Sequence, residues 1–248
     1  MASGLVGHGR MLDPAELLGH LRVALGQKTG PLASKRIVIS AGGTQEAIDP
    51  VRFITNRSSG KQGYAIAQAA LDVGAEVTLI SAPTALTTPV GAKVIAVQSA
   101  EEMLKAVLAV SAGADALIMA AAVADFRPAD VAGNKLKKRD GIPRINLEAA
   151  PDILGAVASL NSGTLRPRVV VGFAAESRDL LANASEKMVS KKLDMIVAND
   201  ISATDAGFDV EQNRVRILTP DGDVEQLSLR SKFAVGQKIM IRLADLLE

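Results

Sequence analysis

The densest group of polar residues follows the apolar run 36–41, and its residue types suit the binding of a phosphate or carboxylate. Glycines let the backbone approach a ligand closely, and hydroxyls and N–H groups at a helix start bind an anion without net positive charge. Asn56 adds both a donor and an acceptor. The residues predicted here to bind substrate or phosphate are Gly42, Gly43, Thr44, Asn56, Ser58, Ser59 and Gly60. The alternative is that Gly42-Gly43 is only a tight turn and Ser58 only a helix N-cap.

A second candidate loop follows the apolar run 114–121. The run ends with Met119, Ala120 and Ala121 and continues with Ala122. The small alanines would let a planar base or an acyl group lie against the backbone. Asp125 could accept a hydrogen bond from a ribose hydroxyl or help to hold a metal ion. Simple close packing of alanines is the alternative.

A compact cationic run, Asn134-Lys135-Leu136-Lys137-Lys138-Arg139, is the third candidate. Alternation across Leu136 could aim Lys135 and Lys137 to one side, where an ammonium group neutralises charge that builds on a phosphoryl group. A solvated charged face is the ordinary alternative.

The fourth candidate is the segment 150–154, where a helix start with Pro151 near its first turn offers backbone N–H groups to an anion or base edge. Further on, Phe173 ends an apolar run, and Lys187 and Lys191 lie four apart on one helix face. Core packing for the phenylalanine and solvent exposure for the lysines are the alternatives.

Alternating strand and helix patterns must position these loops. The strands are expected at 36–41, 76–81, 93–97, 114–121, 169–173 and 194–198, and the helices at 13–25, 58–74, 99–112, from 151, and 179–192. Lys28-Thr29-Gly30-Pro31 reads as a linker. This alternation predicts an α/β fold with a Rossmann-like, doubly wound, mostly parallel sheet, whose strand ends gather ligands. The runs 214–218 and 224–229 predict an appended C-terminal hairpin, used in dimerisation, before a final helix.

Composition excludes several kinds of protein. The 28 Lys and Arg against 27 Asp and Glu give no global field toward nucleic acid or a membrane, so an anion must be bound by local groups. The chain contains no Cys, which excludes a thiol nucleophile on the protein. No apolar run is long enough for a membrane span or a secretory signal, so we expect a cytoplasmic protein with no membrane or nucleic-acid partner.

Many segments, taken in order, resemble the bacterial phosphopantothenoylcysteine synthetase family. They are Ser40 to Thr44, Asp49-Pro50-Val51-Arg52, Asn56 to Lys61, Ala120 to Asp125, Lys135 to Lys138, Pro151 to Leu154, Val171 to Glu176, and Ala198-Asn199-Asp200. The resemblance runs from about residue 36 to the C-terminus and agrees in order and spacing.

The resemblance implies that the chain joins 4′-phosphopantothenate to L-cysteine at the expense of CTP, with Mg²⁺ or Mn²⁺ held mainly by the CTP phosphates. An acyl cytidylate would form first with release of pyrophosphate, and the cysteine amine would then displace CMP. Such chemistry needs charge neutralisation and alignment more than a protein nucleophile, so a chain without Cys is adequate.

The resemblance also assigns residues. Lys135 would hold the triphosphate in the first half-reaction, and Asn56 would contact the acyl intermediate in the second. Ala121 and Ala122 would contact the acyl substrate. The positions that match the CTP site are Met119, Ala120, Ala121, Asp125, Lys135, Pro151, Asp152, Ile153, Leu154, Phe173, Lys187 and Lys191.

Family members are homodimers, and the hairpin and the segment after Asn199 are the expected contacts, so part of each site could come from the partner. The stretch Gly7 to Pro14 resembles the end of the flavin-dependent decarboxylase that many bacteria fuse ahead of the synthetase. The resemblance thus predicts a fragment of a bifunctional protein, with a decarboxylase tail and linker at 1–34, a ligase domain at 35–248, and no FMN.

Three alternatives stay open. A nicotinamide-dependent reductase would need a Gly-x-Gly-x-x-Gly motif after the first strand and an acid at the next strand end, but Ser81-Ala82-Pro83 offers none. A nucleotide-binding module without catalysis would bind CTP without turnover. ATP, which eukaryotic relatives use, is the alternative to CTP, although the run Lys135 to Lys138 resembles the bacterial type.

Overall fold

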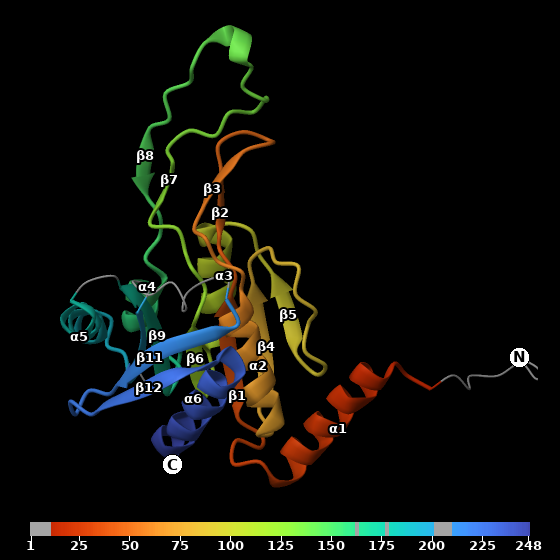
Figure 1. The fold of residues 1–248 in the computed structure, drawn as a ribbon. Coiled ribbons are helices and arrows are strands. Elements are labelled where there is room, and N and C mark those ends of the chain that lie inside the picture. The colour runs from red at the N-terminus through yellow and green to blue at the C-terminus, as the bar shows by residue number, and fades with distance from the viewer. Residues whose placement is uncertain (1–10, 162–163, 177–178, 201–209) are drawn as a thin grey trace, which may run out of the picture.

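The computed structural model describes residues 11–161, 164–176, 179–200 and 210–248, and a single large sheet organises them (Figure 1). The sheet has eight strands in the order β12-β11-β10-β9-β6-β1-β4-β5. All neighbours from β10 to β5 pair in parallel, while β11 and β12 pair antiparallel. The six parallel strands follow the doubly wound order 3-2-1-4-5-6, so the chain changes direction across the sheet between β1 and β6. The predicted fold class is confirmed.

The strands in the middle of this sheet are short and mostly apolar because both faces are covered, whereas the edge strands β5 and β12 are largely exposed. Their bounds are β1 Arg36–Ala41, β4 Glu76–Ser81, β5 Lys93–Ala96, β6 Ala116–Met119, β9 Val169–Glu176, β10 Met195–Asp200, β11 Gln212–Leu218 and β12 Val224–Ser231. The first two match the predicted ranges, and the others differ by up to three residues at either end. The antiparallel pair β11–β12 is the predicted hairpin.

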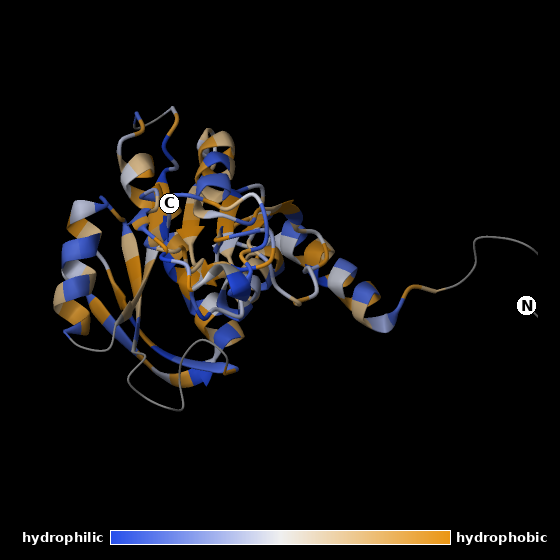
Figure 2. Cartoon of the chain, turned by 90° about the horizontal axis from the view of Figure 1, so that it is seen from above, coloured by the Kyte–Doolittle hydropathy of each residue, from blue (hydrophilic) through white to orange (hydrophobic). Residues whose placement is uncertain are grey.

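Helices cover the two faces separately. Their bounds are α1 Pro14–Thr29, α2 Lys61–Asp72, α3 Ala100–Ser111, α4 Ile153–Ala158, α5 Leu180–Ser190 and α6 Lys232–Leu247. Side chains of α2 and α6 pack in the core of one face, and those of α3, α4 and α5 in the core of the other. Figure 2 shows the orange strands in the middle of the molecule, with helices of mixed colour around them.

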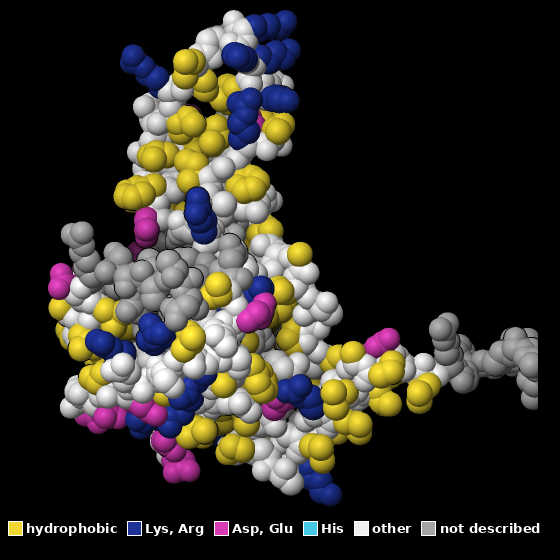
Figure 3. Space-filling model, in the orientation of Figure 1, with side chains coloured by type: hydrophobic (Ala, Val, Ile, Leu, Met, Phe, Trp, Pro, Cys, Tyr) yellow, Lys and Arg dark blue, Asp and Glu magenta, His cyan; other side chains and the backbone are white. Residues whose placement is uncertain are grey.

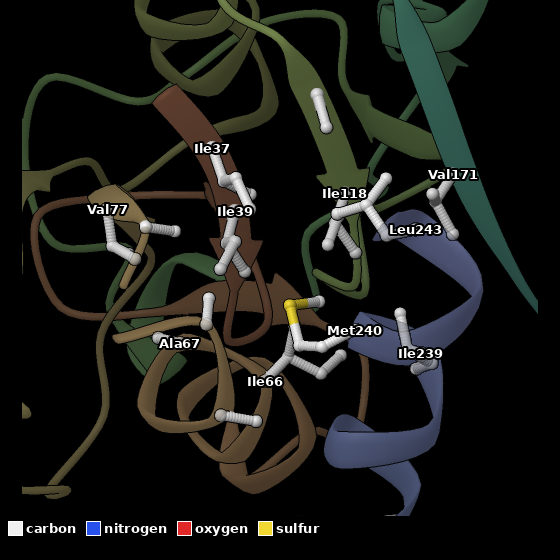
Figure 4. Packing of buried hydrophobic residues seen from close by; sticks show 14 of the residues in the cluster. Ile37, Ile39, Ile66, Ala67, Val77, Ile118, Val171, Ile239, Met240 and Leu243 are labelled. Atoms are coloured by element: carbon white, nitrogen blue, oxygen red, sulfur yellow. The ribbon is translucent and has the colours of Figure 1, made fainter. Parts of the chain in front are cut away.

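The core between the sheet and α2 and α6 illustrates how alternation places side chains. Ile37 and Ile39 of β1 point to this face, whereas Val38 between them belongs to the opposite core. Figure 4 shows these isoleucines facing Ile66 of α2 and Met240 of α6. Both faces are therefore closed, which leaves the strand ends as the places where a ligand reaches the sheet.

Helix α1 is longer than predicted. Asp13 caps it as expected, accepting from the N–H of Ala15 at 3.0 Å, but the helix continues through Lys28-Thr29, which the sequence suggested was a linker. Tertiary packing accounts for the extension, because Gly26 is buried and lies close to the carbonyls of Leu71 and Asp72 at the end of α2. A Cβ at Gly30 would collide with the carbonyl of Val73, so only glycine allows this close approach.

An arm rises above the sheet from the strand ends (Figure 1). It consists of the hairpin β2 Gln45–Ala47 and β3 Phe53–Thr55, the pair β7 Phe126–Pro128 and β8 Leu147–Ala149, and the connection 129–146 with the short 3-10 turn η1 Lys138–Asp140. The sequence did not predict these three-residue strands, because they are too short to show a period. The arm carries the cationic run 134–139.

Candidate active site

A cavity of about 850 Å³ lies at the carboxyl ends of the parallel strands and includes the ends of β6 and β9. This is the place where doubly wound sheets bind ligands, and the volume lies within the range of small-molecule sites. The loops after β3, β6 and β8, the carboxyl-terminal part of β9, the first turns of α2, α4 and α6, and one side of α5 line it. Three of the four candidate segments thus meet at one edge of the sheet together with Phe173 and the lysines of α5, whereas the cationic run 134–139 does not line the cavity.

The turn after β1 supports this cavity from below. Gly42 has φ +84°, a left-handed conformation that favours glycine, and a Cβ there would lie 2.9 Å from the carbonyl oxygen of Ala82. The carbonyl of Gly42 accepts from the N–H of Ala122 at 2.8 Å, which ties the ends of β1 and β6 together. Thr44 is buried, and its Oγ1 accepts from the N–H of Ala124 at 2.9 Å. These residues therefore shape the floor and hold the alanine loop in place.

Asn56 and the start of α2 form the next wall. Asn56 Nδ2 donates to the carbonyl of Val123 at 3.0 Å, which fixes how its amide is turned. Gly60 is the N-cap of α2 with φ +76°, and no side chain caps this helix end. The hypothesis that Ser58 serves only as an N-cap is therefore wrong, and the positive end of the helix dipole is left for a ligand.

The opposite wall holds two lysines in defined positions. Lys187 Nζ of α5 donates to the carbonyl of Phe173 at 2.8 Å, and Lys191 forms an ion pair with Asp152. Asp152 itself is the N-cap of α4 and accepts from the N–H of Gly155 at 2.9 Å. Its own carboxylate thus occupies the place that the sequence suggested for a bound anion, and Pro151 precedes the cap.

The ionisation of Asp152 follows from these contacts. Burial acts to raise the pKa of its carboxyl, but the hydrogen bond and charge of Lys191, the N–H of Gly155 and the charge of Lys187 outweigh it, so the pKa is lowered. The carboxylate stays ionised at neutral pH. Across the whole cavity, Arg57, Lys61, Lys187, Lys191 and Lys232 stand against three acids, Asp125, Asp152 and Glu186. Lys61 is also paired with Glu211, which does not line the cavity, so the local excess of positive charge is smaller than this count.

The cavity brings together most of the residues predicted from the sequence. Those that line it are Asn56, Ser58, Ser59, Gly60, Met119, Ala120, Ala121, Ala122, Asp125, Pro151, Asp152, Ile153, Leu154, Phe173, Lys187 and Lys191. Gly42, Gly43 and Thr44 do not line it, because their backbone and side-chain contacts are used within the turn. Lys135 does not line it either, because it lies exposed on the arm.

A buried carboxylate anchors the connection that bears Lys135. Asp49 Oδ1 accepts from the N–H of Val51 and of Arg52, both at 2.8 Å, and Oδ2 accepts from the N–H of Leu136 at 3.1 Å. Burial acts to raise the pKa of Asp49, but these N–H groups and the charge of Arg52 outweigh it and lower the pKa. Leu136 is therefore fixed, while Lys135 and Lys137 on either side are exposed.

Sequence reasoning missed several polar residues of the cavity. They are Gln62, Asn183, Glu186, Ser190, Asn213 and Lys232. Asn213 lies in the hairpin, which was assigned to dimerisation, and Lys232 lies in the final helix, for which no role was predicted. A buried polar position in an otherwise alternating strand was the available signal for Asn213, since its neighbours two residues apart face the core.

Two absences concern the described residues alone. Within the described ranges, no group of three or more His, Asp or Glu side chains is arranged to hold a metal ion. None of the helices in the part of the chain that the structure describes is long and apolar enough to cross a membrane.

The sheet order, the cavity at its switch point and the cationic walls define an α/β nucleotide-binding class of protein. Comparison with known families makes this specific. The model of the DNA/pantothenate metabolism flavoprotein C-terminal domain matches residues 32–247, and the chain belongs to this family.

Known relatives agree with this assignment. The chain is 45% identical over 248 residues to the coenzyme A biosynthesis bifunctional protein CoaBC of Vibrio vulnificus and 44% identical to that of Bacillus subtilis. Both alignments cover 99% of this chain and 60% of the relative, so the chain spans about three fifths of their length.

Solved structures show the same fold. The crystal structure of the C-terminal domain of a CoaBC protein matches with a TM-score of 0.74 and 39% identity, covering 88% of this chain and 98% of that one. A Cab2 mutant in complex with phosphopantothenate-cysteine matches with a TM-score of 0.70 at 16% identity, which supports the fold alone.

Proposed function

We propose that this chain is a cytoplasmic phosphopantothenate–cysteine ligase that activates 4′-phosphopantothenate with CTP in coenzyme A biosynthesis. One observation carries the proposal: a single cavity collects the alanine loop, Asn56, the uncapped start of α2 and the lysines of α5. Family membership and the names of the bifunctional relatives support the same assignment.

In the first half-reaction, an oxygen of the substrate carboxylate attacks the α-phosphorus of CTP, and the bond to the β-phosphate breaks. The products are an acyl cytidylate and pyrophosphate. The chain contributes positive charge from Lys187 and Lys191 and N–H groups from the start of α2, which stabilise the phosphates as negative charge moves to the leaving group. Lys135 is proposed to complete this neutralisation from the arm.

In the second half-reaction, the amine nitrogen of cysteine attacks the acyl carbon, the bond from that carbon to the phosphate oxygen breaks, and CMP leaves as the amine loses a proton. Asn56 is proposed to position the acyl group, since its amide is oriented by the carbonyl of Val123 beside the alanine loop. This step needs alignment of two bound groups, which supplies much of the rate increase by itself.

Mg²⁺ is proposed to bind with the nucleotide and neutralise its phosphates. The described side chains offer no dedicated cluster of carboxylates, and Mg²⁺ commonly relies on substrate phosphates and water for most of its ligands. Among the carboxylates of the cavity, Asp125 is exposed to it, whereas Asp152 is paired with Lys191. The residues present thus fit a cation that arrives with CTP.

The arm is the better candidate for the subunit contact of a homodimer. Its exposed apolar side chains are Val51, Phe53, Phe126, Val131, Ile142, Ile145 and Leu147. On the hairpin, Val224 is exposed, and the part of the segment after Asn199 at 201–209 lies outside the described residues. Figure 3 shows yellow side chains along the arm and dark blue ones near its end. A second chain that covers this apolar surface could place Lys135 near a cavity.

The N-terminal segment is proposed to belong with a fused decarboxylase domain. Leu18, Leu21 and Leu25 of α1 are exposed at helical spacing, and yellow side chains follow this helix in Figure 3. The stretch 1–10, which includes part of the resemblance to the decarboxylase tail, lies outside the described residues. The bifunctional names of the relatives and their greater length support this proposal.

The nicotinamide alternative gains no support from the end of β4. A dinucleotide site places an acid there to bind the ribose, but this strand ends at Ser81, whose hydroxyl lies 3.0 Å from the hydroxyl of Tyr64. Ser81, Ala82 and Pro83 at this strand end offer no carboxylate that could bind the ribose.

The deciding experiment incubates the protein with 4′-phosphopantothenate, Mg²⁺ and either CTP or ATP, with and without cysteine, and identifies the products by mass spectrometry. We expect an acyl cytidylate and pyrophosphate without cysteine, and the cysteine amide with CMP after cysteine is added. Binding of CTP without any product would instead show a nucleotide-binding module, and product with ATP alone would correct the co-substrate.

A further inference from the structure

Glu46 is a buried acidic residue outside the cavity, and the mechanism above does not use it. It is the middle residue of β2, and only 4% of its surface is exposed. Its Oε1 accepts from the N–H of Ala100, the first residue of α3, at 2.9 Å. Burying a carboxylate is costly unless hydrogen bonds and favourable charge replace the lost water. The start of α3 supplies both, through its N–H groups and the positive end of its dipole.

The start of α3 also has a local cap, so the bond to Glu46 is an additional one. Ser99 is the N-cap, and its Oγ accepts from the N–H of Glu102 at 3.2 Å. Glu102 Oε2 in turn accepts from the N–H of Gln98 at 2.6 Å. Both bonds lie within one short segment. Glu46 comes from a segment 54 residues away, so its bond joins α3 to the arm.

Two successive residues attach β2 to this helix start. The N–H of Gln45 donates to the carbonyl of Gln98 at 2.8 Å, and Glu46 then accepts from Ala100. The hairpin β2–β3, at the base of the arm in Figure 1, has three residues in each strand. A two-stranded ladder this short is not stable by itself. Contacts with α3 therefore help to decide how the hairpin is oriented.

The same hairpin leads directly to Asn56. Thr55 ends β3, pairs with Gln45, and its Oγ1 donates to the carbonyl of Thr44 at 2.7 Å. Asn56 is the next residue, and its Nδ2 lies 3.0 Å from the carbonyl of Val123. A rotation of the hairpin would change this distance, because Asn56 adjoins the ladder. The bond of Glu46 is thus connected to the orientation of Asn56 by one short, continuous structure.

The other ladder of the arm reaches the same turn of α3 at the surface. Arg127 Nη1 of β7 lies 3.6 Å from Glu101 Oε2, and these side chains are 35% and 41% exposed. Exposed ion pairs of this kind contribute little to stability. The buried bond of Glu46 therefore holds the arm more firmly than this ion pair does.

We propose that Glu46 is a positioning residue for amide formation. Through the hairpin it holds Asn56 beside the alanine loop, where Asn56 is proposed to position the acyl group. Glu46 does not touch the substrate, since it does not line the cavity. Its role in amide formation rests on the proposed function, whereas its effect on the orientation of Asn56 does not.

The test combines product analysis with NMR spectroscopy of the whole chain. Glu46→Ala removes the acceptor, and Glu46→Gln keeps an oxygen in its place. Ser99→Ala is the matched control, because it removes an acceptor from the same helix start without touching the hairpin. Glu46→Ala should slow amide formation about tenfold more than acyl cytidylate formation, because the second step depends on alignment. The NMR signal of the Asn56 side-chain amide, recorded without substrates, should shift in this variant.

The conservative variant and the control separate positioning from stability. Glu46→Gln and Ser99→Ala should each change the ratio of the two half-reactions by less than about twofold, since the acceptor for Ala100 remains in both. The Asn56 signal should stay near its native position in both. If Glu46→Ala does not fold, Glu46→Asp, whose carboxylate is one carbon shorter, takes its place with the same expected outcomes.

An unshifted Asn56 signal in Glu46→Ala would overturn the inference, even if activity fell. Equal slowing of both half-reactions, or the same change of ratio in Ser99→Ala, would overturn it too and assign Glu46 to the stability of α3 alone. The proposed function fails separately. Without any amide product from the native chain, the ligase would be removed, and the shift of the Asn56 signal would still decide whether Glu46 positions that residue.

Discussion

The cavity and the arm carry the two residues proposed as catalytic, yet the protein holds them in different ways. Asn56 lies in the cavity and donates to a carbonyl of the neighbouring alanine loop. Lys135 lies exposed on the connection 129–146, outside the cavity, although its neighbour Leu136 is anchored to Asp49. The cavity is thus assembled within one chain, while the arm presents its lysine to solvent.

This difference follows from how the cavity and the arm are built. Strand ends of a parallel sheet are positioned by a core packed on both faces, so the groups that follow them are held closely. The arm contains two short ladders, the bonds of Asp49 and a few further contacts such as the N–H of Ala100 to Glu46, and many of its apolar side chains are exposed. These exposed side chains are the reason why the arm is proposed as the surface that a second chain covers.

The largest expected effect tests whether the arm acts on the cavity. Lys135→Gln should lower pyrophosphate release from CTP and 4′-phosphopantothenate by about 10²-fold or more, because a compact charge beside the triphosphate is lost. Stability should change by less than about 0.5 kcal/mol, since the side chain is exposed. Pyrophosphate release and thermal unfolding measure the two quantities.

Lys138→Gln is the matched control, because it removes the same charge from the same exposed run. Equal loss of activity in both variants would mean that the net charge of the arm matters rather than Lys135. Unchanged release in Lys135→Gln would remove this residue from the mechanism.

The next effect separates the two half-reactions in the cavity. Asn56→Asp should leave acyl cytidylate formation partly intact and slow amide formation by about 10²-fold, because a negative charge would lie near the acyl phosphate and face the carbonyl of Val123. Accumulation of the acyl cytidylate in the presence of cysteine, followed by mass spectrometry, measures this. Equal losses in both half-reactions would refute the separate role of Asn56.

The smallest effect concerns the anchor of the arm. Asp49→Asn keeps an oxygen for the N–H groups of Val51 and Arg52 but loses the acceptor for Leu136 and the charge opposite Arg52. Amide exchange at Leu136 should become faster, and pyrophosphate release should fall only a few-fold, as expected for a positioning residue. Asp130→Asn is the matched control, since Asp130 is exposed on the same connection.

The contacts of Asp49 should also depend on pH. The pKa of Asp49 is lower in the folded protein than its ordinary value, so its stabilising effect is complete above that ordinary value and disappears as the pH falls through the lowered pKa. As the pH falls, the surroundings of Leu136 in the wild-type protein should therefore become similar to those in the Asp49→Asn variant. The chemical shift of the Leu136 amide measures this change. A constant difference between the two across this range would contradict the anchor.

Much of the large sheet could be read from the sequence. Short, mainly apolar runs such as 36–41 and 76–81 became strands with those bounds, because strands buried on both faces need apolar residues at most positions. The arm could not be read in this way, since β2, β3, β7 and β8 have three residues each and no period develops over that length. β7 pairs with β8 across the connection 129–146, and no local pattern specifies that pairing.

Part of the site could likewise be predicted from the sequence, and part depended on the tertiary structure. Residue types predicted the alanine loop and the polar loop with Asn56 as neighbouring candidates, because the loops after parallel strands share one edge of the sheet, and the family resemblance added the lysines of α5. Only the tertiary structure placed Gly42 and Thr44 beneath the cavity rather than in it, and kept Lys135 outside it. It also brought Asn213 and Lys232, from the far end of the chain, against the start of α2. Contacts between segments so far apart depend on how helices pack across a sheet, which no local pattern of residues specifies.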